Sequence, residues 1–147
     1  MSIKETLTQD LKLALKEKDT IKKNTVQGIR AAILQFEKDN LTELDDDGIL
    51  DVIAKELKKR KDVLPEYEKS GRQDLITQLN REIEIVMGYL PSQLSEDELD
   101  EIVKTAVEST GAAGMKDMGK IMAEVMPKIK GRADGKMVNA LAKKYLM

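Results

Sequence analysis

The chain has 147 residues, of which 35% are charged, 41% hydrophobic and 3% aromatic, and its formal net charge is −2. This length suits one domain or two small subdomains, and the composition is typical of a helical protein with a strongly hydrated surface. Cysteine and histidine are both absent, which excludes disulfides and cysteine metal sites and removes the most common general base and metal ligand, so much of enzyme chemistry is excluded.

Residues 3–36 predict two amphipathic helices joined by a short turn, in which Asp19 or Thr20 can cap the second helix. A turn this short predicts an antiparallel hairpin. The charged N-terminal segment lacks the apolar core of a signal peptide, and no apolar run approaches the roughly 20 residues of a membrane span, so we expect a cytoplasmic protein without a membrane partner. The positions expected to face inward are Ile3, Leu7, Leu11, Ala14 and Leu15 in the first helix and Ile21, Val26, Ile29, Ile33 and Phe36 in the second.

An acidic run at residues 45–47 precedes the third predicted helix, which extends from about Gly48 to Ser70. The run lacks the further oxygen ligands and the distant glutamate of an EF-hand loop, so we interpret it as a helix N-cap with acids favoured by the helix dipole. The cations at residues 55–61 indicate either a solvated helix face or a second anion-binding patch. Pro65 should kink this helix or break it into two pieces. A fourth helix is predicted for residues 72–90.

The best internal boundary lies at Pro91, because a helix ends there and a capping box at residues 95–98 begins the next one. The sequence shows no strand pattern and no convincing internal repeat. It therefore predicts an all-α, multihelical fold, with a four-helix N-terminal part at residues 1–91 and a compact three-helix C-terminal part at residues 92–147.

The last two predicted helices are joined by a basic turn. Apolar side chains repeat at helical spacing over residues 118–129, Gly131 stands where a C-terminal cap belongs, and Asp134 can N-cap the last helix. From residue 111 onwards there are eight Lys or Arg residues against three acidic ones, a net charge of +5, which leaves −7 for the rest of the chain. This asymmetry favours an anionic partner for the basic part, although a basic helix face is often only solvated.

The residues favour binding over catalysis, and we predict no catalytic residue, no metal ligand and no cofactor. Without histidine, no serine or threonine has its usual activating base, although a lysine base stays open. Paired carboxylates such as Asp97 and Glu101 occupy polar helix faces, where they are typical of solubility. The glycines at residues 111–114 neither follow a strand nor precede the Lys-Ser/Thr pair of a phosphate-binding loop.

If RNA is the anion, its recognition must depend on backbone and shape. The only aromatic residues are Phe36, Tyr67, Tyr89 and Tyr145, and they are not grouped as a base-stacking platform. Glycines 131 and 135 either allow close backbone approach or simply form a helix cap and a helix start. Phosphate contacts are expected from Lys120, Lys128, Lys130, Arg132 and Lys136.

Three segments carry a family resemblance: GYLPSQLS at residues 88–95, MGKIM at 118–122 and KGRADGKMVN at 130–139. With them, and over essentially its whole length, the chain resembles the GatB/YqeY family and is most similar to the stand-alone bacterial members. The family shares its helical tail with the B subunit of the glutamine-dependent aspartyl/glutamyl-tRNA amidotransferase. The resemblance implies an all-α appendage that engages the tRNA body, while amide transfer takes place elsewhere.

The resemblance transfers function only in part, because nothing in the chain matches the kinase-like domain or the amidase subunit of the amidotransferase. It implies an accessory protein that binds tRNA or another structured RNA, and it implies no DNA partner. A description as a carbon–nitrogen ligase with glutamine as amide donor would be inherited from full-length relatives, and such an activity is a further alternative only as part of a complex. The alternative is a module that docks on a translation-related enzyme through a methionine-rich helical surface.

With the family motifs added, the predicted site comprises RNA-contacting residues and residues that shape the backbone. The predicted RNA contacts are Lys116, Lys120, Lys128, Lys130, Arg132, Lys136, Asn139 and Lys143. The predicted structural residues of the motifs are Gly119, Gly131, Ala133, Asp134, Gly135 and Val138.

Overall fold

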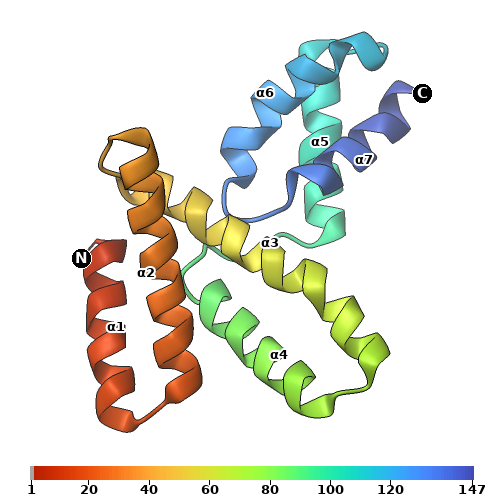
Figure 1. Cartoon of the computed structure of the whole chain (residues 1–147). Coiled ribbons are helices and arrows are strands. Elements are labelled where there is room, and N and C mark those ends of the chain that lie inside the picture. The colour runs from red at the N-terminus through yellow and green to blue at the C-terminus, as the bar shows by residue number, and fades with distance from the viewer. Residues whose placement is uncertain (1) are drawn as a thin grey trace. The chain divides into compact units, whose positions relative to one another are not determined.

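A computed structural model describes residues 2–147, and within these residues the chain forms seven α-helices, one short 3-10 turn and no strand (Figure 1). The prediction of an all-α, multihelical fold is confirmed. The chain divides into two compact units, an N-terminal one that ends at Leu90 and a C-terminal one from Pro91 to Met147. The N-terminal unit contains α1 (Ile3–Glu17), α2 (Thr20–Asn40), α3 (Asp46–Ser70) and α4 (Gln73–Met87). The C-terminal unit contains α5 (Glu96–Thr110), the 3-10 turn η1 (Met115–Asp117), α6 (Met118–Ile129) and α7 (Gly135–Leu146).

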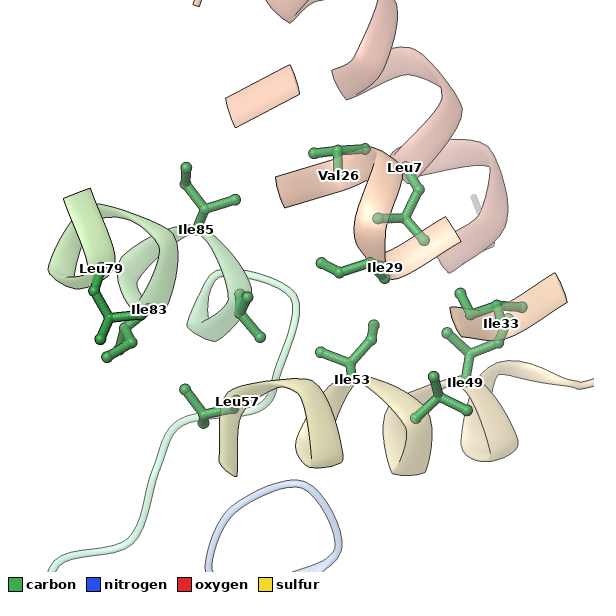
Figure 2. Packing of buried hydrophobic residues seen from close by; sticks show 12 residues of the cluster. Leu7, Val26, Ile29, Ile33, Ile49, Ile53, Leu57, Leu79, Ile83 and Ile85 are labelled. Carbon is green, nitrogen blue, oxygen red and sulfur yellow. The ribbon is translucent and has the colours of Figure 1, made fainter. Parts of the chain in front are cut away.

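Helices α1 and α2 form the predicted hairpin and pack with α3 and α4 around one apolar core (Figure 1). Figure 2 shows Ile53 of α3 pointing toward Ile29 of α2, and both side chains are fully buried. The helix starts follow the predicted caps: the Asp19 carboxylate accepts a hydrogen bond from the backbone N–H of Lys22, and Asp45 accepts one from Gly48. The acidic run before α3 is thus confirmed as a helix N-cap.

Helix α3 continues through Pro65 as one element of 25 residues, so of the two outcomes predicted at this proline, a kink or a break, the break is wrong. Proline removes the backbone hydrogen bond to the carbonyl of Lys61, but both Pro65 and Lys61 are exposed residues of the helix. Leu64 and Tyr67 pack against the core on the other side. Tertiary packing therefore stabilises the helix on both sides of the proline.

Two positions predicted to face inward are exposed instead. Leu15 of α1 is 55% exposed and Phe36 of α2 is 36% exposed. Both lie on helices whose other apolar residues, such as Leu7 and Ile33, already fill the core contact with α3 and α4. The apolar stripe on each helix is wider than the face that the rest of the unit covers. The fourth helix also ends earlier than predicted, at Met87.

The C-terminal unit has its own core, formed by α5, α6 and α7. Its first helix begins with the predicted capping box, in which Ser95 and Glu98 each accept a hydrogen bond from the backbone N–H of the other. The turn η1, which the sequence analysis did not predict, lies immediately before α6. None of the helices at residues 2–147 combines the length and the apolar character that a membrane span requires.

Candidate nucleic-acid interface

The centre of the candidate site is the α6–α7 turn, residues 130–134. Helix α6 ends at Ile129, and its carbonyl accepts hydrogen bonds from the backbone N–H groups of Arg132, at 2.7 Å, and Ala133, at 3.2 Å. Gly131 has a φ of +73°, in the left-handed region where a side chain is unfavourable. Asp134 caps α7 as predicted, because its carboxylate accepts a hydrogen bond from Lys136 N at 3.0 Å. The turn therefore begins with a helix C-terminal cap that has a glycine in the left-handed conformation.

The segment at residues 91–94 holds this turn in place. The amide of Gln93 donates from Nε2 to the Gly131 carbonyl, at 2.7 Å, and to the Pro91 carbonyl, at 3.2 Å. Leu94 N donates to the Arg132 carbonyl at 2.9 Å, and Arg132 Nε donates to the Ser92 carbonyl at 3.0 Å. Sequence analysis missed Gln93 as a site residue. Its signal lies in the segment GYLPSQLS, which from the sequence alone indicates only a boundary and a family motif.

Four of the predicted RNA contacts lie on or beside the α6–α7 turn. Lys128 occupies the last turn of α6 and pairs with Glu124 at 4.0 Å. Arg132 is near Glu98, whose pKa lies below its ordinary value, mainly because the carboxylate accepts hydrogen bonds from Ser95 and further because of the Arg132 charge. We call the following four residues the turn cations: Lys128, Lys130, Arg132 and Lys136.

The structure places the other three predicted cations farther along the helices. Lys116 lies in η1, and Lys120 in the first turn of α6 is 3.5 Å from Asp117. The pKa of the Asp117 carboxyl is lowered, first by a hydrogen bond from the backbone N–H of Ala113 and then by the nearby lysine charges. Lys143 follows Lys136 by seven residues on α7, a rise of about 10 Å along the helix axis. We therefore do not count Lys116, Lys120 and Lys143 among the turn cations.

Asn139 differs from the other predicted contacts. It lies on α7, and its side-chain oxygen Oδ1 is buried without a hydrogen-bond partner among residues 2–147. Most buried polar atoms have such a partner, so an unpaired acceptor is an unusual feature. The buried Oδ1 is therefore not an exposed contact atom, in contrast to the ammonium group of Lys136.

The predicted structural residues have distinct positions. Val138 is fully buried, Ala133 packs against the core, and Gly135 is the first residue of α7. Gly119, in contrast, has no heavy atom of residues 2–147 within 4 Å of the place that a Cβ would occupy, apart from its chain neighbours and the nearby backbone of its own helix. Neither steric crowding nor a positive φ explains a glycine at residue 119.

We expect Gly131→Ala to lower the free energy of unfolding by about 1–2 kcal/mol, because alanine is strained at positive φ. Gly119→Ala should instead leave the free energy of unfolding unchanged or raise it by up to about 1 kcal/mol, because alanine has a higher helix propensity than glycine. Urea unfolding of both variants measures the difference. Equal effects of the two substitutions would contradict the assigned role of Gly131.

The site offers cations and a fixed backbone, and no group of three acidic side chains in the described part of the chain is placed to hold a metal ion. The cations of the site can pair with an anion through charge complementarity. Ammonium and guanidinium groups donate strong hydrogen bonds to phosphate oxygens.

Comparison with known proteins gives one family match and several relatives. A family model described as "Yqey-like protein" matches residues 4–146. "Altered inheritance of mitochondria protein 41, mitochondrial" from Pyrenophora tritici-repentis is 32% identical over 130 residues, covering 86% of this chain and 71% of the relative. The protein of the same description from Kluyveromyces lactis is 35% identical, covering 82% and 70%. A glutamyl-tRNA(Gln) amidotransferase component from Thermococcus gammatolerans is 44% identical over 57 residues, which are 36% of this chain and 9% of that protein.

Proposed function

Because this chain belongs to the family of Yqey-like proteins, we propose that it binds tRNA or another structured RNA through the α6–α7 turn. The observation that carries the proposal is that the four turn cations lie on or beside a turn whose backbone is held by the segment at residues 91–94. The partial similarity to a protein named for a tRNA amidotransferase supports RNA as the anion. We assign the chain an accessory binding role without catalysis.

The proposed recognition acts on phosphates and shape. Tyr145 is the only aromatic residue of the C-terminal unit, and its hydroxyl donates to the Asp100 carboxylate at 2.9 Å. A lone tyrosine engaged with an acid does not supply a series of stacking surfaces for unpaired bases. Cations on a fixed turn suit the regular phosphate backbone of a folded RNA, whose binding releases counterions.

The cellular location is part of the proposal. The chain has no cysteine and therefore cannot form the disulfides that are typical of oxidising compartments. This composition supports the cytoplasm as its location. The names of the two fungal relatives contain the word mitochondrial, so mitochondria are the other compartment to test. Fractionation of the source cells, followed by detection of the chain, distinguishes the two.

The test is a triple charge reversal, Lys128→Glu, Lys130→Glu and Lys136→Glu, with tRNA binding measured by fluorescence anisotropy over a range of salt concentrations. Arg132 is kept, because its side chain also holds the Ser92 carbonyl. We expect the dissociation constant for tRNA to rise roughly 10- to 100-fold at low salt. The logarithm of the association constant should also depend less steeply on the logarithm of the salt concentration. The magnitude of that slope should fall by about three, close to one for each phosphate that is no longer neutralised.

A matched control changes the net charge equally in the N-terminal unit. Lys12, Lys61 and Lys69 are exposed there, and their reversal to glutamate should leave tRNA affinity close to that of the unmodified chain. If both triple variants lose the same affinity, the binding depends only on net charge. If the turn variant keeps its affinity and its salt dependence, the turn is not the RNA site.

A further inference from the structure

A cavity of about 430 Å³ opens on the α1–α2 hairpin, in the N-terminal unit. Its apolar lining comes from both helices, and Leu34 within it is 54% exposed. Leu15 lies on the same face of α1 as the lining residues Lys4 and Thr8, because residues 4, 8, 11 and 15 follow one another at helical spacing. Of the apolar lining, Leu34 and Ala31 are exposed, whereas Leu7 and Ile33 are buried and form its floor. We call it the hairpin groove; the lining residues that matter for its chemistry are Lys4, Leu7, Arg30, Ile33, Leu34 and Glu37.

Two of the three charged residues of the hairpin groove are already engaged. Lys4 Nζ lies 2.7 Å from the Glu37 carboxylate and 3.8 Å from Glu43. Glu37 also accepts a hydrogen bond from the backbone N–H of Leu44 at 2.7 Å. These contacts explain why the pKa of Glu37 is lowered, first through the Lys4 hydrogen bond and then through Leu44. Neither residue therefore has its charge uncompensated.

Arg30 is the charged lining residue without a carboxylate partner in the part of the chain that the structure describes. Its neighbours one helical turn away are uncharged: Val26, Gln27, Ile33 and Leu34. Arginine presents five N–H donors in a fixed fork that fits a carboxylate. The hairpin groove thus combines a cavity of mixed apolar and polar lining with one exposed cation that can pair with a carboxylate.

We propose that the hairpin groove receives one face of an acidic amphipathic helix from a partner protein. Apolar side chains of that helix occupy the cavity beside Leu34, and a carboxylate at its edge pairs with Arg30. Helix α1 spans 15 residues, or about 22 Å, which gives room for about four turns of a helix lying along the hairpin. Apolar anchors at helical spacing with a matching flank charge are the usual features of helix-in-groove recognition.

This proposal extends beyond RNA binding, because the hairpin groove and the α6–α7 turn belong to different units. The two can succeed or fail separately. The triple reversal of turn lysines should leave peptide binding in the hairpin groove unchanged. Conversely, substitutions in the hairpin groove should leave tRNA affinity unchanged.

The test uses the full chain and a displayed library of 18-residue helical peptides. The peptides carry leucines at helical spacing, and their flanking positions vary among Glu, Gln and Lys. We expect selection to enrich Glu-flanked over Lys-flanked peptides by roughly tenfold or more, a difference of about 1.4 kcal/mol. Arg30→Glu should reverse that preference. Lys61→Glu, which reverses an exposed charge on α3, should leave the preference unchanged.

Site-specific protection locates the bound peptide. Because the chain has no cysteine, Ala31→Cys places a single thiol in the lining of the hairpin groove. Its alkylation by maleimide should slow severalfold when the selected peptide is bound. Leu34→Glu should abolish binding, whereas Leu13→Glu, at an exposed leucine of α1 outside the lining, should keep it. Circular dichroism checks that both variants are folded.

Three outcomes would overturn the proposal. The unmodified chain could select Glu-flanked and Lys-flanked peptides equally, and the Arg30→Glu variant could do the same. Peptides could bind without protecting the thiol at residue 31. The chain could also be a dimer in light scattering and become a monomer on Leu34→Glu, in which case the hairpin groove is an interface between two copies of this chain.

Discussion

Replacing Ile129 by alanine should lower the free energy of unfolding of the C-terminal unit by about 2–5 kcal/mol. Ile129 is fully buried in the core of that unit and is the last residue of α6. The substitution removes buried methyl and methylene groups and leaves a cavity. The same residue supplies the carbonyl that accepts two hydrogen bonds from the α6–α7 turn, so a looser packing of residue 129 also loosens the turn.

Hydrogen exchange of the α5, α6 and α7 amides in the full chain measures this effect unit by unit. Met126→Ala is the matched control, because Met126 lies on the same helix and is 42% exposed, and it should cost less than about 1 kcal/mol. A cost for Ile129→Ala no larger than that of Met126→Ala would show that Ile129 is not part of the core. tRNA affinity should fall for Ile129→Ala and persist for Met126→Ala.

The second large effect is expected in the N-terminal unit, where Arg60→Ala should cost about 3–5 kcal/mol. Arg60 of α3 donates to Glu82 of α4 at 3.2 Å and lies 3.4 Å from the Glu56 carboxylate. The side chains of Arg60 and Glu56 are only 16% and 12% exposed. Removal of the guanidinium leaves two largely buried carboxylates, of which Glu56 still pairs with the exposed Lys59.

Thermal or urea unfolding of three variants tests this assignment. Lys59→Ala is the control, because that side chain is mostly exposed, and it should change the free energy of unfolding by less than about 1 kcal/mol. Adding Glu82→Gln to Arg60→Ala should recover part of the loss, because it removes one of the unpaired charges. If the double variant recovers nothing, the loss in Arg60→Ala comes from packing of the arginine stem and not from charge.

The candidate site separates into a part that shapes the turn and a part that can contact an anion. Gly131, Asp134 and Gln93 shape the turn through backbone geometry and hydrogen bonds. The ammonium group of Lys136 does not take part in these bonds, so its reversal tests binding with little effect on folding. This separation explains why Arg132 is a poor choice for a charge reversal, since it holds the Ser92 carbonyl.

The sequence by itself determined the helices, their caps and the family. Asp19, Asp45, Ser95 and Asp134 each cap the helix that they were predicted to cap. These caps follow from hydrogen bonds between residues two or three positions apart, so they need no knowledge of the rest of the fold. The three motifs likewise identified the family without any structure.

Only the tertiary structure decided which surfaces are covered and which distant segments meet. Gln93 and Gly131 are 38 residues apart in the chain, and no local pattern shows that the amide of one bonds the carbonyl of the other. The exposure of Leu15 and the continuous helix at Pro65 also depend on how α1 and α3 pack. Local hydrogen bonding fixes a helix and its ends, whereas burial and long-range hydrogen bonds arise only once helices pack against one another.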